Sequence, residues 1–325
     1  MKIVTVKTPA RLHMGILDVN GGLGRIYGSL GLAIQKPTVV LEASESDILQ
    51  VEGLDRRRAE QAAKTFLQHF NIDRPCRIKV KSTIPSHVGL GSGTQLRLAV
   101  AKSLATLYRV DGSTRELAGI MGRGTVSGIG TAAFDHGGFN IDGGVPTMEE
   151  NRRLPAPIIF SQPFPEDWLL VVAIPDASKG YSGPIEDRAF ADLPSAPPEL
   201  VGRMCRVLVM KLLPSLVEHD IRGFGSALTE LQRLTGECFS SIQGGQFAGN
   251  IVSETVRFLL NEGAYGAGQS SWGPTVYGLV EGCSAAESLV KQVRAFLDAS
   301  VGGRVFYTAA NNNGAEVKVS EDIKQ

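Results

Sequence analysis

The stretch PSHVGLGSGTQ, residues 85–95, decides the fold, because a glycine-rich turn runs directly into an amphipathic helix. Glycines let the backbone approach a ligand closely and take positive φ angles. The helix points unpaired N–H groups and the positive end of its dipole back at the turn, which creates a site for an anion such as phosphate. The residues that we expect to bind phosphate are His87, Gly89, Leu90, Gly91, Ser92, Gly93, Thr94 and Gln95.

The spacing of this loop separates it from two common phosphate motifs. The Walker pattern needs Lys-Ser or Lys-Thr after its last glycine, whereas Thr94 and Gln95 follow Gly93 here. The loop also lacks the glycine spacing of the dinucleotide fingerprint. The hydroxyls of Ser92 and Thr94 suit either a phosphate or a Mg²⁺ ion that bridges phosphates.

Upstream, the segment PARLHMGILD, residues 9–18, places polar side chains in an apolar stretch that follows a strand. Arg11 can form a forked hydrogen bond with a phosphate or a carboxylate, and the nearby His13 is titratable. We interpret Arg11, His13 and Asp18 as candidate catalytic residues, and the alternative is a strand end with solvated charges. The glycine-rich segment at 21–31 predicts a mobile flap that carries Arg25 to the substrate.

Downstream, the segment GRGTVSGIGTAAFDHGG, residues 122–138, sets charged side chains among small residues that permit close approach to a ligand. We predict catalytic roles for Arg123, Asp135 and His136, with a tight turn between a helix and a strand as the alternative. A strand over 139–141 follows. The substrate contacts that we expect from this segment are Ser127, Gly128 and Thr131.

A fourth segment, GAYGAGQSSWGP at residues 263–274, precedes a strand and reads as a flexible turn. Gln269, Ser270 and Ser271 offer neutral hydrogen-bonding groups to a substrate. Trp272 either stacks on an aromatic ring or caps the core. The loop at 175–183 adds Lys179 to the predicted substrate contacts.

Composition narrows the function classes. The chain has 325 residues, of which 43% are hydrophobic and 20% charged, as in a soluble globular protein of roughly two domains. The net formal charge of zero argues against a nucleic-acid binder, which would carry a basic field. The longest apolar run, 168–174, is too short to span a bilayer. Four cysteines without a Cys-x-x-Cys pair and a first strand in place of a signal peptide favour a cytoplasmic protein.

Periodicity predicts an α+β chain with a β-rich first half and a helix-rich second half. We expect strands over 2–8, 38–42, 77–81, 168–174, 275–280 and 304–308. We expect helices over 55–70, 94–108, 199–216, 219–234, 250–262 and 285–298, with another that begins at Thr114. The charged residues at the end of the chain are expected to fray. We divide the chain into residues 1–180, which hold the phosphate loop, and residues 181–325.

Residues 9–31, 85–95, 122–144 and 263–280 resemble, in the same order, the motifs of the GHMP superfamily of galacto-, homoserine, mevalonate and phosphomevalonate kinases. The resemblance implies a two-domain fold with a ferredoxin-like C-terminal domain. In the kinases, an Asp that handles the substrate hydroxyl stands where this chain has Gly130. The third glycine-rich motif is altered as well, between Gly266 and Gly273. The loss of both features indicates a different reaction on the same scaffold.

The combination of RLHMGILD, GLGSGTQ and SGIGTAAFDHGGF is similar to that of the β-ribofuranosylaminobenzene 5′-phosphate synthases. The resemblance implies that phosphoribosyl pyrophosphate condenses with 4-aminobenzoate or 4-hydroxybenzoate, and that CO₂ and pyrophosphate are released. This reaction belongs to tetrahydromethanopterin biosynthesis. The resemblance also implies a Mg²⁺-dependent homodimer. The alternatives are an ATP-dependent small-molecule kinase of the same superfamily and a non-catalytic binding protein.

The implied reaction divides the predicted site residues by task. Donors in the phosphate loop would stabilise the departing pyrophosphate. Arginines would hold phosphates, because an arginine clamp on the acceptor carboxylate would stabilise the ground state and slow decarboxylation. Neutral Ser, Thr and Gln donors would then orient that carboxylate. Asp18, Asp135 or Asp142 would hold Mg²⁺ or orient a histidine, and we take Ser92 and Asp142 as the metal ligands.

Overall fold

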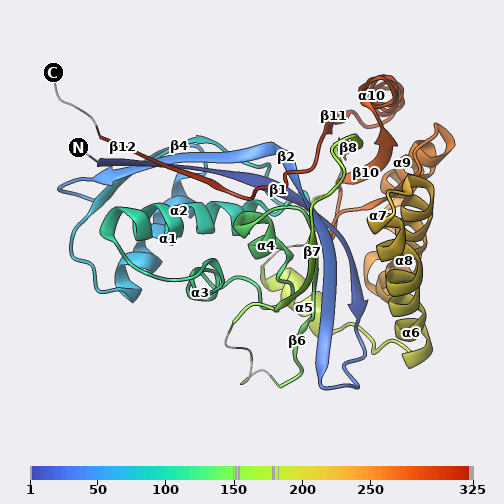
Figure 1. The fold of residues 1–325 in the computed structure, drawn as a ribbon, viewed down its shortest axis with the longest axis horizontal. Helices are drawn as coiled ribbons and strands as arrows, with labels where there is room; N and C mark the ends of the chain where they lie inside the picture. The colour runs from blue at the N-terminus through green and yellow to red at the C-terminus, as the bar shows by residue number, and fades with distance from the viewer. Residues whose placement is uncertain are drawn as a thin grey trace.

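The computed structural model describes residues 2–148, 150, 152, 154–177, 180, 181 and 183–321. It contains two β-sheets and a set of helices that pack against them (Figure 1). The strands are β1 (Lys2–Asp18), β2 (Arg25–Glu45), β3 (Gln50–Gly53), β4 (Cys76–Ser82), β5 (Phe139–Asp142), β6 (Val145–Pro146), β7 (Ile158–Gln162), β8 (Trp168–Pro175), β9 (Gly266–Gln269), β10 (Val276–Glu281), β11 (Gly303–Thr308) and β12 (Glu316–Glu321).

The helices include a π-helical segment, η2, that continues the helix before it. They are α1 (Arg56–His69), α2 (Ser92–Tyr108), α3 (Thr114–Ile120), α4 (Ile129–Asp135), α5 (Pro184–Ala191), α6 (Pro198–Val207), η2 (Leu208–Leu212), α7 (Leu213–Val217), α8 (Ile221–Gln243), α9 (Asn250–Asn261) and α10 (Cys283–Asp298).

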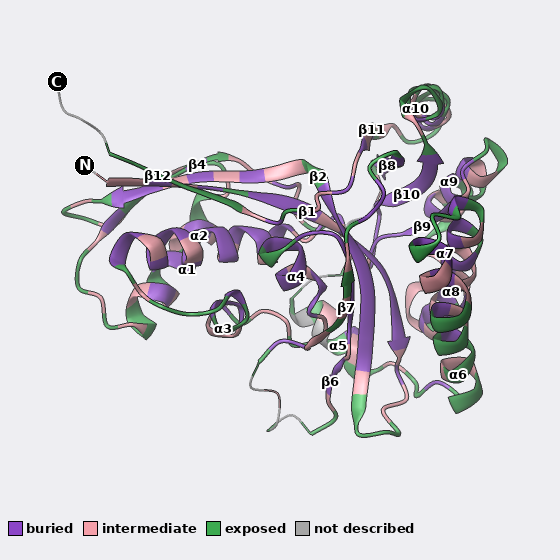
Figure 2. Ribbon diagram, in the orientation of Figure 1, coloured by how far each residue is buried: buried purple, intermediate pink, exposed green. Residues whose placement is uncertain are grey.

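The larger sheet has eight strands. Five follow the order β12-β1-β2-β4-β3, β5 and β6 also pair with β2, and β7 pairs with β5. Helix α2 packs against β1 and β2 and is buried along most of its length (Figure 2). Its apolar side chains form one core with both strands. This packing fixes where the N-terminus of α2, and so the glycine-rich loop, meets the sheet.

Strands β1 and β2 form a long antiparallel hairpin that bends between its two halves (Figure 1). The pairing register shifts between Pro9 and Ala10 and again between His13 and Gly15. Such irregularities bend a strand and increase its twist. The bend turns residues 9–18 toward the smaller, four-stranded sheet.

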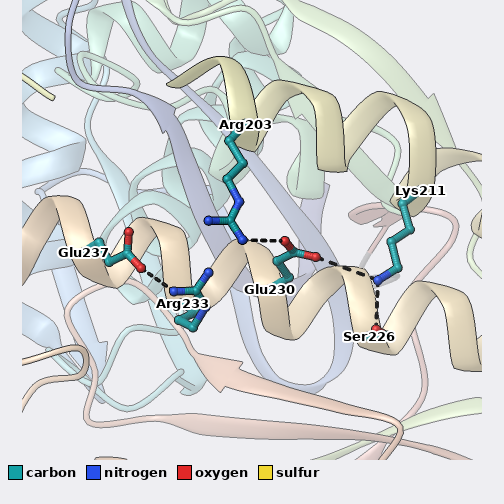
Figure 3. A network of polar contacts seen from close by, with 6 residues as sticks. All are labelled: Arg203, Lys211, Ser226, Glu230, Arg233 and Glu237. Carbon is teal, nitrogen blue, oxygen red and sulfur yellow. Dashed lines mark hydrogen bonds and ion pairs between the residues drawn. The ribbon is translucent and has the colours of Figure 1, made fainter. Parts of the chain in front are cut away.

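The second sheet has four strands in the order β11-β8-β10-β9. Helices α8, α9 and α10 contact it. On the outer side of α8, Glu230 forms ion pairs with Arg203 at 3.1 Å and Lys211 at 3.8 Å, which tie α6 and η2 to α8 (Figure 3). No helix in the described part of the chain is long and apolar enough to cross a membrane.

The α+β prediction is confirmed, and each predicted strand and helix range overlaps an observed element. Three local predictions are wrong. Residues 25–31 of the flap expected at 21–31 belong to β2, which pairs there with residues 13–18 of β1. Residues 266–269, expected as a turn, form the buried strand β9. Residues 316–321, part of the segment expected to fray, form β12 and pair antiparallel with β1, and residues 322–325 lie outside the described residues.

The predicted division at residue 180 does not coincide with either sheet. Strand β8 lies before it but pairs with β10 and β11 in the second sheet. Strand β12 lies after it but pairs with β1 in the first. The chain therefore crosses between the two sheets more than once.

Candidate functional site

A cavity of about 780 Å³ lies where the two sheets and α5 and α8 meet. Segments from all four predicted regions reach it. The sequence-predicted residues that line it are Arg11, His13, Thr94, Arg123, Ser127, Gln269, Ser271 and Trp272. Gly130, at the position of the kinase aspartate, lines it as well.

One carbonyl group joins three of the predicted segments. The Gly89 oxygen accepts hydrogen bonds from Nη1 of Arg11 and, at 2.7 Å, from Oγ of Ser270. Ser270 Oγ in turn accepts the backbone N–H of His13 at 3.0 Å. A Cβ at Gly89 would lie 2.2 Å from the Ser270 carbonyl oxygen, so only glycine permits this contact.

Arg11 lies between the glycine-rich loop and the cavity. Its backbone N–H donates to the Leu90 carbonyl at 3.2 Å, and a Cβ at Gly91 would lie 3.0 Å from its Cγ. Burial lowers the pKa of Arg11 to about 10; Glu186 opposes this shift, and Arg123 adds to it. The guanidinium remains charged at neutral pH and faces the cavity.

The N-terminus of α2 is surrounded by arginines. No side chain caps it, so its first-turn N–H groups are available to an anion. A Cβ at Gly93 would lie 3.3 Å from Nη2 of Arg58 and 3.7 Å from Nη2 of Arg123. Arg123 Nε donates to Thr94 Oγ1 at 3.1 Å. Among the predicted loop residues that the structure describes, Thr94 alone lines the cavity.

His13 lines the cavity two residues beyond Arg11 on β1. Only 7% of its surface is exposed. Burial, reinforced by the charge of Arg11, lowers the pKa of His13 to about 3. The imidazole is therefore neutral throughout the physiological pH range.

Another part of the cavity wall is aromatic. The Trp272 ring contacts Phe190 at 5.4 Å and Phe239 at 5.1 Å between centroids, both edge to face. Phe190 also packs on Tyr27 at 5.2 Å, and all four rings line the cavity. Trp272 thus belongs to a core cluster, and its ring also lines the cavity.

Two buried glutamines hold the wall in place. Gln95 accepts the Thr8 hydroxyl and donates to the Gly130 carbonyl, both at 2.8 Å. Gln269 accepts the Ala248 N–H at 2.8 Å and donates to the Ser271 carbonyl at 2.7 Å. Both side chains therefore support the protein, and Gln269 also lines the cavity, whereas the sequence suggested a phosphate contact for Gln95 and a substrate contact for Gln269.

Asp142 also has a structural position. Its Oδ1 accepts the N–H groups of Ser29 and Gly144, and its Oδ2 accepts the N–H of Gly128 and the hydroxyl of Ser127, at 2.8–3.1 Å. Burial raises its pKa, and these bonds oppose the shift. A carboxylate that already accepts four protein donors has little capacity left for a cation.

The other proposed metal ligand, Ser92, is the buried first residue of α2. Among the described residues, no group of three His, Cys, Asp or Glu side chains is placed to hold a metal ion. Ser92 and Asp142 therefore do not fit Mg²⁺ as a ligand pair.

Thr131, next to Gly130, buries its hydroxyl without a hydrogen-bond partner in the described residues.

The structure separates several predicted residues from the cavity. Asp18 Oδ1 accepts the N–H groups of Asn20 and Gly21 in the β1–β2 turn. Arg25 donates to the carbonyls of Gly143 and Gly144. Of the remainder, Asp135 and His136 pair with each other at 3.6 Å, His87 is exposed at a φ of 62°, and Lys179 lies outside the described residues.

Sequence reasoning missed several lining residues. Glu186 and Phe190, four residues apart on one face of α5, both line the cavity. Arg152 also lines it, and Gln232 and Thr235 reach it from α8. Arg58 does not line the cavity but lies beside Gly93; the run Arg56-Arg57-Arg58 is its only local signal in the sequence.

Comparison with known proteins places this geometry in a family. Residues 57–138 match the model of the GHMP kinases N terminal domain, and residues 212–299 match that of the GHMP kinases C terminal domain. A curated relative from Archaeoglobus fulgidus, named beta-ribofuranosylphenol 5'-phosphate synthase, is 38% identical over 98% of this chain and 100% of its own. A protein of the same name from Methanothermobacter thermautotrophicus is 34% identical over 95% and 97%.

Solved structures agree on the fold. A homoserine kinase from Cytophaga hutchinsonii superposes with a TM-score of 0.66 at 18% identity, and the match covers 97% of each chain. Identity at this level supports the fold alone, and function is argued from the site.

Proposed function

We propose that this chain is a pentosyltransferase. The premise is that the chain belongs to the beta-ribofuranosylphenol 5'-phosphate synthase family of the GHMP superfamily. It joins phosphoribosyl pyrophosphate to 4-hydroxybenzoate and releases CO₂ and pyrophosphate. The names of the relatives describe a product that contains a phenol, and loss of CO₂ from 4-hydroxybenzoate leaves a phenol. We therefore place 4-hydroxybenzoate ahead of 4-aminobenzoate as the acceptor.

The observation that carries this proposal is the contrast between the two ends of the cavity. Arg11, Arg123 and the uncapped N-terminus of α2 form a cationic end suited to pyrophosphate. The rings of Trp272, Phe190 and Phe239 form an aromatic end, a surface suited to contact with an aromatic ring. A site with both ends can hold a phosphorylated sugar against an aromatic acceptor.

Charge development then explains the chemistry. As pyrophosphate leaves ribose C1, an oxocarbenium-like centre forms and the leaving group gains negative charge. Arg123 and the α2 N–H groups, fixed before the reaction, stabilise that charge, and loss of one such donor costs about 3 kcal/mol. The acceptor carbon that bears the carboxylate attacks C1. The C–CO₂ bond then breaks, and its electron pair restores the aromatic ring.

A kinase reaction is the less well supported alternative. Gly130 has no side chain, and a Cβ there would already lie 3.1 Å from Cγ2 of Thr94. Asp135, the carboxylate considered as a substitute, is held by the Thr114 hydroxyl at 2.5 Å and is half exposed outside the cavity. Glu186 is the only carboxylate among the described lining residues. A non-catalytic protein would need no such arginine-lined end.

Mg²⁺ dependence stays part of the proposal, although Ser92 and Asp142 do not supply its site. Oxygens of a pyrophosphate are the usual partners of this ion, so we expect it to enter with phosphoribosyl pyrophosphate. EDTA should abolish turnover without lowering the thermal unfolding temperature of the free protein. A fall in that temperature would indicate a resident metal instead.

The direct test uses purified protein, MgCl₂, phosphoribosyl pyrophosphate and carboxyl-labelled 4-hydroxybenzoate. Release of labelled CO₂ that depends on both substrates supports the proposal, and a parallel reaction with 4-aminobenzoate decides the acceptor. No release with either acceptor, together with ATP turnover on a small alcohol, would establish the kinase alternative. Gel filtration of the same sample tests the proposed homodimer, and cell fractionation tests the proposed cytoplasmic location.

A further inference from the structure

Arg11, His13 and Ile16 line the cavity in this order along β1. We call the part of the cavity at His13 its midpoint. Arg11 touches the phosphate loop through the Gly89 carbonyl. Ile16, at the other end of this segment, belongs to the same apolar cluster as Tyr27 and Trp272. His13 lies between them and about 6.6 Å along the strand from Arg11, at 3.3 Å per residue. It therefore faces the region where the cationic end meets the aromatic end.

The position of His13 is fixed by its backbone. Its N–H donates to Ser270 Oγ at 3.0 Å, and its carbonyl accepts the Ser271 N–H at 3.2 Å. In the described part of the chain, its ring makes no side-chain hydrogen bond. The strand thus holds an imidazole against the cavity with its nitrogens available to a ligand.

The surrounding charges keep this imidazole neutral. Arg11 on the same strand and Arg123 from the segment after α3 are cationic, Arg152 lines another part of the wall, and Glu186 on α5 is the only carboxylate among the described lining residues. The Arg11 charge and burial both oppose protonation of His13. A bound pyrophosphate would favour protonation, but its charge is shared with Arg11 and Arg123. The midpoint therefore has a polar group without a positive charge.

We propose that His13 is the group that faces the acceptor carboxylate, and that it serves the reaction by being polar and uncharged at that place. The inference rests on the proposed function. A cation there would stabilise the carboxylate more than the departing, neutral CO₂, and so would raise the barrier to decarboxylation. A neutral imidazole orients the carboxylate by one hydrogen bond. Arg11 and Arg123 then bind the phosphates.

The test compares His13→Gln with His13→Lys by steady-state kinetics and by the carboxyl ¹³C isotope effect. The glutamine keeps a neutral donor, and we expect its loss of kcat to be at least tenfold smaller than that of the lysine variant. The lysine adds a cation, and we expect kcat to fall 30-fold or more. Its KM for 4-hydroxybenzoate should be equal or lower, and its isotope effect larger, because decarboxylation becomes slower than the preceding steps. The KM for phosphoribosyl pyrophosphate should not change.

A wild-type measurement guards against misfolding of the lysine variant. If a neutral group faces the carboxylate, then phenol and 4-hydroxybenzoate should bind within threefold of each other in the presence of pyrophosphate. Binding of the carboxylate-bearing ring tenfold tighter than phenol would place a cation there and overturn the inference. Equal losses of kcat in His13→Gln and His13→Lys would also overturn it. Wild-type protein that releases no CO₂ would instead refute the proposed function, and this inference with it.

Discussion

Two histidines of this chain stand in similar sequence surroundings, but folding shifts their pKa values in opposite directions. His13 and His136 each lie among small residues with a charged residue nearby. His13 is buried in the cavity near Arg11, and its pKa falls to about 3. His136 is partly exposed, and its hydrogen bond with Asp135 raises its pKa. The charge of the nearby residue, Arg11 or Asp135, can be read from the local sequence, whereas burial cannot. The two together decide whether folding lowers or raises the pKa of the histidine.

The sharpest test of this comparison changes the cationic end near His13. Arg123→Ala removes the guanidinium beside Gly93 and Thr94. We expect kcat to fall about 100- to 1,000-fold, as for loss of one preorganised donor to a developing anion. Steady-state assays of pyrophosphate release measure it. Arg203→Ala is the matched control, because Arg203 makes an exposed ion pair on α6 (Figure 3), and activity equal in the two variants would contradict the assignment.

A smaller effect should appear in stability against pH. The folded-state pKa of His13 is about 3, below the ordinary value of 6.5. Between these values the unfolded chain binds one more proton, so stability falls as the pH falls. The slope is at most about 1.4 kcal/mol per pH unit. Urea unfolding of wild type and His13→Asn from pH 7.5 to 4.5 should show two curves that diverge below pH 6.5. Parallel curves would mean that folding does not lower the pKa of His13.

His136 should behave in the opposite sense. Its raised folded-state pKa means that its contribution is fully present below 6.5 and is lost as the pH rises through the folded value. NMR titration of the imidazole signals should show His136 with a midpoint above 6.5. In the same spectra, His13 should not titrate above pH 4.5. A midpoint for His136 below 6.5 would remove the contrast.

The smallest effect should follow changes at the exposed pair itself. Asp135→Asn removes a half-exposed partner of His136, and such pairs contribute at most about 1 kcal/mol. We expect turnover within twofold of wild type and a small loss of stability, measured by CO₂ release and by thermal unfolding. A loss of activity as large as that of Arg123→Ala would restore Asp135 to the catalytic group.

The site could be predicted in part because its local features have local causes. The glycines within residues 89–93 predict a loop, and the apolar stripe of α2 predicts a buried helix. Strand β9 could not be found this way. A Cβ at Gly266 would lie 2.3 Å from the Gly225 carbonyl oxygen of α8, and one at Gly268 would lie 2.4 Å from Gln232. These glycines serve close packing of a strand on a helix, whereas in isolation they resemble a flexible turn.

By itself, the sequence determined the α+β class, the main helices and the loop that precedes α2, because helix periodicity and glycine spacing are properties of neighbouring residues. It also placed Arg11, His13 and Arg123 among the candidates. Only the tertiary structure separated these residues from Asp18, Asp135 and Asp142. Burial and the direction of a carboxylate depend on chain segments that are far apart in sequence. The same distant contacts brought Glu186 and Phe190 of α5 into the cavity.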